Sequence, residues 1–210
     1  MHYDALTKNG RRVYDQLGKA DFLDNFYLAG GTALALQIGH RISVDLDFFS
    51  SDPIKKNLLQ QVEGLLGDKF SLETRVNNSG ELTLVVDDVK VTFLHYPFCL
   101  LFDLERTDGL SFLSPKEIGV TKAYTIGRRG EYKDYIDLYF LLKQKHTTLV
   151  ELMTLAEQKY SQAFNSKLFL EQLLYEGDVE EVEIEFLQSV VSRRKLSAFF
   201  REQISKIKLE

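Results

Sequence analysis

The sequence of 210 residues predicts an α+β fold, in which a mixed sheet with flanking helices is followed by a C-terminal helical bundle. In the first half, short apolar runs alternate with turn residues, a pattern typical of strands and short helices. From Ser114 onward, apolar residues recur only at helical spacing. We therefore expect two domains, 1–108 with the sheet and an N-terminal helix, and 109–210 with the remaining helices.

The apolar segments of the first half define its elements. Strands are expected over Phe26–Ala29, Val44–Phe49, Phe70–Asn77, Leu82–Val86 and Val89–His95. Helices are expected over Tyr3–Leu17, Thr32–Gly39 and Ile54–Leu66, with Pro53 as an early helical residue of the last. The last two strands join at Asp87-Asp88.

The second half opens with a strong helix start, since Ser114 can cap the helix, Pro115 suits its first position and Glu117 follows three residues after the cap. Helical periodicity then predicts helices over Ile118–Ile126, Glu131–Lys143, Leu149–Tyr160, Lys167–Tyr175, Glu180–Val191 and Lys195–Lys208. We expect no strand in this half.

The composition narrows the class of protein. Hydrophobic residues form 44% of the chain, enough for a core, and only 3 prolines argue against disorder. The single cysteine, Cys99, lies in an apolar context, so we expect it in the core of a cytoplasmic protein without a signal peptide or membrane span. A net charge of -5 disfavours a protein that mainly grips nucleic-acid phosphates, so an RNA substrate would need a local basic patch.

A first candidate motif is the pair Gly30-Gly31 between an expected strand and an expected helix. Glycines let the backbone turn sharply and approach a ligand, and the free N–H groups at the start of a helix favour a phosphate. A tight turn with no ligand explains the same pair.

A second motif places Asp45 and Asp47 two residues apart in an expected strand, so they share one face. Two neighbouring carboxylates repel unless a cation neutralises them, and Mg²⁺ prefers one or two carboxylates plus substrate phosphates. Arg41 would enter near bound phosphates, Ser43 stands on the same face, and His40 finishes the preceding helix. The alternative is an edge strand with a polar outer face.

The helical half holds a third constellation, made of Lys122, Arg128, Arg129, Lys133, Asp134 and Asp137. Lys122 stands in an apolar segment, an unexpected place for a lysine. Because Gly130 ends the first helix, Lys122 and Asp137 can face each other across a helix hairpin. Ordinary ion pairs on the helix surface are the alternative.

These motifs carry a resemblance. The string LAGGTALAL at 28–36, followed by HRISVDLDFF at 40–49, resembles the opening motif of the AbiEii/AbiGii toxin family of nucleotidyltransferases, which belongs to the DNA polymerase β-like superfamily. The residues Lys122-Ala-Tyr, Arg128-Arg-Gly and Lys133-Asp-Tyr-Ile-Asp137 resemble its second signature. The resemblance covers residues 20–145 and implies a polymerase β-like nucleotidyltransferase fold.

The resemblance also implies roles for the site residues. Gly30, Gly31 and the helix start at Thr32 would cradle the nucleotide phosphates, with Arg41 and Ser43 beside them. Asp45 and Asp47 would bind Mg²⁺, Lys122 would contact the triphosphate, and Asp137 would act as a base or orienting group. The pattern departs in one place: many relatives carry a third carboxylate on a later strand, where this chain has Thr92.

The expected activity is transfer of a nucleoside monophosphate from a nucleoside triphosphate to an acceptor hydroxyl, with a tRNA 3′ end as the candidate acceptor and an antitoxin as the partner. The basic cluster Arg193-Arg194-Lys195 is a second candidate patch for RNA, or a solvated helix end. Two alternatives remain open, a non-catalytic nucleotide-binding or protein-interaction module and an enzyme that modifies small molecules.

Overall fold

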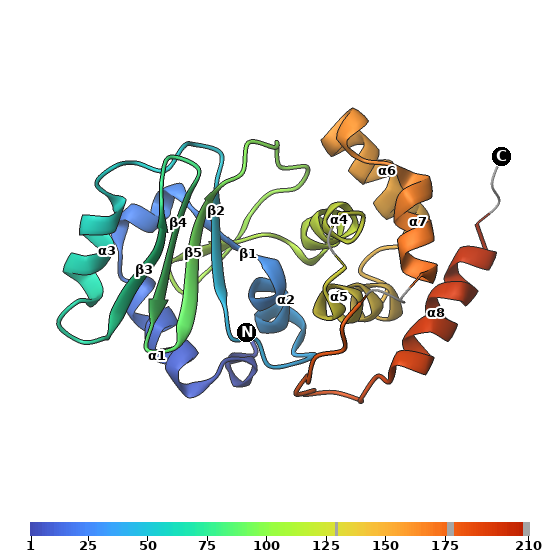
Figure 1. The fold of residues 1–210 in the computed structure, drawn as a ribbon, viewed down its shortest axis with the longest axis horizontal. Coiled ribbons are helices and arrows are strands. Elements are labelled where there is room, and N and C mark those ends of the chain that lie inside the picture. The colour runs from blue at the N-terminus through green and yellow to red at the C-terminus, as the bar shows by residue number, and fades with distance from the viewer. Residues whose placement is uncertain (129, 176–178, 208–210) are drawn as a thin grey trace. The chain divides into compact units, whose positions relative to one another are not determined.

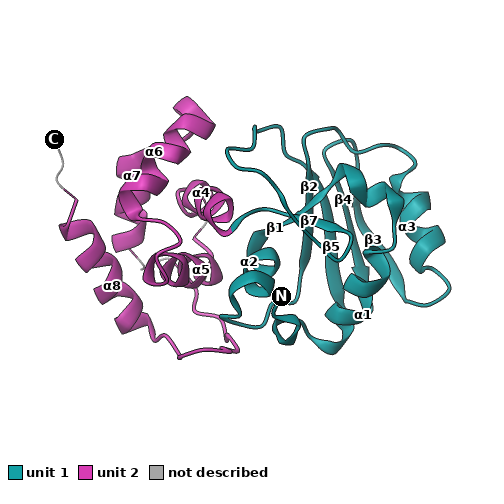
Figure 2. Ribbon diagram, turned by 180° about the vertical axis from the view of Figure 1, so that it is seen from behind, with its two compact units in different colours: residues 1–114 teal, residues 115–210 magenta. Residues whose placement is uncertain are grey.

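The structure is a computed structural model that describes residues 1–128, 130–175 and 179–207. The chain divides into two compact units, Met1–Ser114 (unit 1) and Pro115–Glu210 (unit 2), shown in two colours in Figure 2. The division falls after Ser114 rather than after residue 108, because strand β7 (Leu110–Phe112) pairs with β1 (Tyr27–Ala29) and so belongs to the sheet.

The described residues of unit 1 form a seven-stranded sheet in the order β3-β4-β5-β2-β1-β7-β6. The remaining strands are β2 (Leu46–Ser50), β3 (Leu72–Asn77), β4 (Glu81–Val86), β5 (Val89–His95) and β6 (Glu105–Thr107). Strand β2 is antiparallel to β1 and parallel to β5, so the sheet is mixed as predicted. The hairpin between β4 and β5 turns at Asp87 and Asp88, whose φ angles of 46° and 69° suit a two-residue turn.

The hairpin of β6 and β7 was not predicted. Each strand has three residues, too few for an alternating pattern to stand out. Their turn, Asp108-Gly109, has φ angles of 54° and 78°. An Asp-Gly pair is a strong hairpin signal, so this turn is the feature from which the hairpin could have been found.

The helices of unit 1 are η1 (Tyr3–Ala5), α1 (Lys8–Leu17), η2 (Asp21–Asn25), α2 (Gly30–Ile38) and α3 (Leu58–Leu66), and α2 and α3 lie on opposite faces of the sheet (Figure 1). The single N-terminal helix expected over Tyr3–Leu17 is wrong, because Thr7 is extended and caps α1 by accepting a hydrogen bond from the Gly10 amide.

The expected start of the helix at Ile54 is also wrong. The amide of Ile54 donates to the carbonyl of Ser79, and α3 begins only at Leu58. Pro53 therefore stands outside the helix. A distant backbone partner overrides the local helix signal here.

The core of unit 1 packs around the aromatic ring of Phe93 on β5. The ring stacks on Phe48 of β2 with centroids 5.4 Å apart, and the edge of Phe26 approaches it at 5.2 Å. Cys99, expected in this core, is exposed instead in the segment that follows β5. Its apolar neighbours in sequence did not predict burial, because the segment lies outside the sheet.

Unit 2 is helical, with α4 (Pro115–Ile126), α5 (Tyr132–Lys143), α6 (Leu149–Tyr160), η3 (Ser161–Ala163), α7 (Ser166–Leu174) and α8 (Arg193–Ser205). Helix α4 packs against α5 and α6. The helix expected over Glu180–Val191 is wrong, since these residues lie in no helix. Four glutamates in close succession repel one another, and Val190 is 72% exposed, so no apolar face anchors a helix.

The expected helix at Lys195–Lys208 begins earlier, at Arg193, where the Ser192 side chain accepts a hydrogen bond from the Lys195 amide. Lys208 lies outside the described residues. Among the helices that the structure describes, none has the length and apolar character needed to cross a membrane.

Candidate active site

The junction of β1 and α2 is built around Gly30. This glycine has a φ of 66°, a conformation that side chains rarely adopt. A Cβ atom at Gly30 would stand 2.7 Å from Oδ2 of Asp47, closer than any real contact. Glycine is therefore required both for the turn and for the close approach of the Asp47 carboxylate.

The two acidic residues are placed differently from the expectation. Asp47 lies in β2, opposite Ala29 of β1 and Thr92 of β5. Asp45 precedes the strand, which begins at Leu46, and Val44 is exposed rather than turned into the core. The Asp45 side chain is 23% exposed, and its Oδ2 lies 3.6 Å from the ammonium of Lys90.

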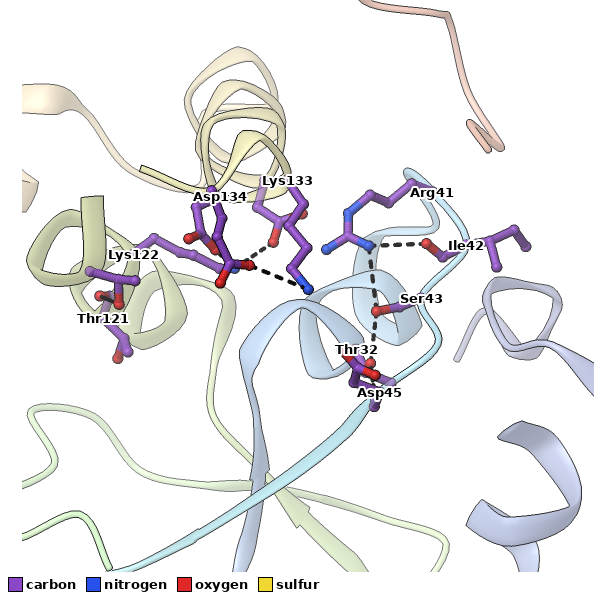
Figure 3. A network of polar contacts seen from close by, with 12 residues as sticks. Thr32, Arg41, Ile42, Ser43, Asp45, Thr121, Lys122, Lys133 and Asp134 are labelled. Carbon is purple, nitrogen blue, oxygen red and sulfur yellow. Dashed lines mark hydrogen bonds and ion pairs between the residues drawn. The ribbon is translucent and has the colours of Figure 1, made fainter. Parts of the chain in front are cut away.

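A buried set of hydroxyls fastens the start of α2 to the segment that leads into β2 (Figure 3). The hydroxyl of Thr32 donates to Oγ of Ser43 at 2.8 Å and also contacts the carbonyl of Asp45. The guanidinium of Arg41 donates to the Ile42 carbonyl at 3.0 Å and to Ser43 Oγ at 3.4 Å. These side chains hold the backbone on both sides of Gly30 and Asp45 in a defined position, and their direct contact with a nucleotide stays a prediction.

The N-terminal segment supports the same region, which sequence reasoning missed. The amide of His2 donates to Leu36 O at 2.7 Å, and the amide of Ser43 donates to Ala5 O at 2.8 Å. Helix α2 ends at Gly39, whose φ is 59°, and the His2 ring occupies the space of a Cβ there. His40 is fully buried directly after this turn. Only long-range pairing reveals such a support, so no local pattern could have found it.

In unit 2, Lys122 of α4 meets two aspartates of α5 (Figure 3). Its Nζ lies 2.6 Å from Asp134 Oδ1 and 2.7 Å from Asp137 Oδ2, and the three side chains are 8%, 1% and 0% exposed. The predicted approach of Lys122 and Asp137 across the hairpin is confirmed, and the alternative of surface ion pairs is wrong.

Of the basic residues of the same constellation, Lys133 directly precedes Asp134 on α5 and lies beside this cluster in Figure 3. Lys133 is 38% exposed and pairs with Glu131 at 3.4 Å, and Arg128 is exposed after the end of α4. Arg129 lies outside the described residues. A second buried ion pair, between Lys159 of α6 and Glu117 of α4, was missed, because Glu117 also fits a helix-capping pattern.

The acidic residues of unit 1 suit a magnesium ion held partly by its substrate. Within the described part of the chain, no group of three or more His, Cys, Asp or Glu side chains could hold a metal ion. Thr92, the neighbour of Asp47 on β5, bonds to the Thr83 hydroxyl at 3.3 Å and offers no carboxylate. Asp45 and Asp47 fit Mg²⁺, which usually takes one or two carboxylates and completes its shell with phosphates and water.

The family model for the "Nucleotidyl transferase AbiEii toxin, Type IV TA system" matches residues 11–210 of the chain. The chain belongs to the AbiEii family of nucleotidyltransferase toxins. A relative described as the uncharacterised protein aq_aa25 of Aquifex aeolicus is 30% identical over 181 residues, which cover 84% of this chain and 85% of the relative.

Solved structures share the fold of this AbiEii chain. MenT4, a nucleotidyltransferase toxin from Mycobacterium tuberculosis, aligns with a TM-score of 0.59 at 18% identity, over 98% of this chain and 85% of MenT4. A protein from H. pylori aligns with a TM-score of 0.55 at 18% identity, over 93% and 92% of the two chains. The predicted fold class is thereby confirmed.

Proposed function

We propose that this AbiEii chain transfers a nucleoside monophosphate from a nucleoside triphosphate to an acceptor hydroxyl, and that the acceptor is the 3′ end of a tRNA. The observation that carries the proposal is the placement of Asp47 against Gly30. An acidic side chain held against a glycine turn at the start of a helix brings metal-binding and phosphate-binding groups together.

The residues of unit 1 have distinct parts in this proposal. The turn at Gly30, Gly31 and Thr32 would contact the phosphates through its backbone N–H groups. The Thr32 side chain has a different part, because its hydroxyl is already bonded to Ser43. Asp45 and Asp47 would hold Mg²⁺, which when bound neutralises charge on the triphosphate. The bonds of Thr32, Arg41 and Ser43 keep the segment that carries Asp45 in place.

Lys122 and Asp137 supply the second part of the family signature. We assign Lys122 to the triphosphate, with Asp134 and Asp137 fixing the direction of its ammonium. In the reaction, a bond forms between the acceptor oxygen and the α-phosphorus while the bond to the β-phosphate oxygen breaks. Pyrophosphate leaves, and the hydroxyl proton passes to water; of the two roles that the family pattern gives Asp137, base or orienting group, its burial against Lys122 favours the orienting group.

The family is a toxin family, so we also propose a cognate antitoxin as the partner of this chain and the cytoplasm as its compartment. Nucleoside triphosphates and tRNA meet there, and one unpaired cysteine suits a reducing compartment.

A second function, nucleotide binding without transfer, is favoured by Thr92. This residue lies beside Asp47 on the neighbouring strand, where a third carboxylate would strengthen a metal site. Such a protein would bind a triphosphate with magnesium and turn over slowly or not at all.

The test combines purified protein, Mg²⁺, total tRNA and each α-labelled nucleoside triphosphate. Asp45→Ala removes a proposed metal ligand, and Asp52→Ala is the matched control, an exposed aspartate just beyond the other end of β2. Label in RNA with the wild type and Asp52→Ala, but not with Asp45→Ala, supports transfer. Magnesium-dependent thermal stabilisation by a triphosphate without any transfer supports the binding module, and the absence of both effects overturns both functions.

A further inference from the structure

A three-layer stack lies where α4 ends beside α6 and η3 in unit 2. The rings of Tyr124 and Tyr160 are 4.0 Å apart and nearly parallel, with 17° between their planes. The guanidinium carbon of Arg128 lies 4.3 Å from the centre of the Tyr124 ring. Because Tyr160 already covers one face of Tyr124 at this distance, Arg128 covers the other face.

The Arg128 side chain is held in this place from a second direction. Its Nη2 donates to the carbonyl of Ala163 in η3 at 3.4 Å. A long side chain that is fixed by both a ring and a hydrogen bond has lost much of its rotamer freedom before any ligand arrives. The residue is nevertheless exposed to solvent.

The charge of Arg128 has no acidic partner within residues 1–128, 130–175 and 179–207. Among the residues that the structure describes, no carboxylate lies within ion-pair distance of its guanidinium, whereas Lys133 pairs with Glu131 and Lys159 with Glu117. In the described part of the structure, a pre-oriented planar cation without an acidic partner is therefore presented to solvent by a chain whose net charge is -5.

We propose that Arg128 is a stacking platform for an unpaired nucleobase of a bound RNA strand, an inference that rests on the proposed RNA acceptor. Proteins hold single-stranded RNA by stacking bases on aromatic rings and guanidinium planes, and the positive charge also attracts the neighbouring phosphate. Tyr124 and the Ala163 carbonyl hold the guanidinium in place, and Tyr160 extends the stack on the other side of Tyr124. Every base has a π-face, so the platform favours unpaired RNA without selecting its sequence.

The test measures binding of a short single-stranded RNA that contains 2-aminopurine, a base whose fluorescence falls on stacking. Arg128→Lys keeps the charge and removes the plane. We expect about tenfold weaker binding and loss of the fluorescence change, as for the removal of one base-stacking partner. The control is Arg201→Lys, an exposed arginine of α8 in the same unit for which the structure shows no ring contact; it should bind as the wild type does.

Two further probes identify the ligand. An oligonucleotide with an abasic residue in place of 2-aminopurine should bind the wild type and Arg128→Lys with similar affinity, and free nucleoside triphosphate should bind both equally. Equal RNA affinity of wild type and Arg128→Lys, an equal loss in Arg201→Lys, or a loss confined to the free triphosphate would each overturn the proposal. The assay measures binding and needs no nucleotide transfer. If the protein shows no transfer but Arg128→Lys still weakens RNA binding, the proposed reaction is wrong and the proposed stacking role of Arg128 stands.

Discussion

Nζ of Lys122 lies 2.7 Å from Oδ2 of Asp137, and both side chains are buried between two helices of unit 2. Removing one member of a buried ion pair leaves an uncompensated charge. We expect Lys122→Met, which strands two carboxylates, to lower the free energy of unfolding by about 3 kcal/mol in urea titrations. Lys167→Met is the control, since Lys167 of α7 is 87% exposed, and it should cost less than about 1 kcal/mol. If both variants lower the free energy of unfolding by a similar amount, the buried ion pairs of Lys122 do not contribute to stability as expected.

Gly30→Ala tests the turn that accommodates Asp47. The new Cβ would lie 2.7 Å from Asp47 Oδ2 at a φ of 66°, so we expect a loss of more than about 1 kcal/mol in stability and weaker magnesium-dependent binding of triphosphate. Gly64→Ala is the opposite control. That glycine lies within α3 with nothing near its Cβ position, so alanine should stabilise the protein by about 0.5–1 kcal/mol in thermal unfolding. If Gly30→Ala changes neither stability nor triphosphate binding, the backbone at Gly30 and the Asp47 side chain can shift to accommodate the new Cβ.

Thr32→Val examines the buried hydroxyl set. The substitution keeps the shape of the side chain and removes its hydrogen bonds to Ser43 and to the partly buried Asp45 carbonyl, whereas Ser43 Oγ keeps its contact with Arg41. The expected cost is about 1–3 kcal/mol, together with a rise in the dissociation constant for triphosphate measured by calorimetry. Thr154→Val, at an exposed hydroxyl that bonds only within α6, should change neither quantity measurably. If Thr32→Val binds triphosphate with unchanged affinity, these buried hydroxyls do not support the triphosphate site.

Glu151 predicts a pH dependence of stability. Hydrogen bonds from Lys116 at 2.7 Å and Thr147 at 2.9 Å lower the pKa of its carboxyl below the usual value for a glutamate. A lowered folded-state pKa gives stability that is present above the unfolded-state pKa and is lost as the pH falls through the folded-state pKa. Wild type should therefore exceed Glu151→Gln in urea unfolding near neutral pH, and the difference should shrink below about pH 4. If the difference in free energy of unfolding between wild type and Glu151→Gln does not change with pH, the lowered pKa of Glu151 is not its cause.

Local patterns predicted the elements whose residues carry their own signal. Alternation predicted β3, β4 and β5 within about two residues, and the pair Gly30-Gly31 marked the junction of β1 and α2. The approach of Lys122 and Asp137 followed from the spacing of two helices around a glycine. Local patterns failed where segments distant in sequence determine the structure. The amide of Ile54 donates to the Ser79 carbonyl, and the amide of Ser43 donates to the Ala5 carbonyl. Neither hydrogen bond leaves a signal in the local sequence.

The candidate site shows the same division. Residue types and spacing indicated Asp45 and Asp47 but could not show that Asp45 precedes the strand and faces Lys90 at 3.6 Å. The segment 180–191 had helical spacing without an apolar partner surface, and spacing alone does not hold a helix.

The most direct test of the central claim compares the fate of the α- and γ-phosphates. Wild-type protein is incubated with Mg²⁺, total tRNA and the same nucleoside triphosphate, labelled at either phosphate, beside Asp47→Asn and the control Asp52→Asn. Nucleotide transfer predicts α-label in RNA and γ-label in released pyrophosphate, with both lost in Asp47→Asn and kept in Asp52→Asn. Transfer of the γ-label to RNA, or full activity of Asp47→Asn, would contradict the account.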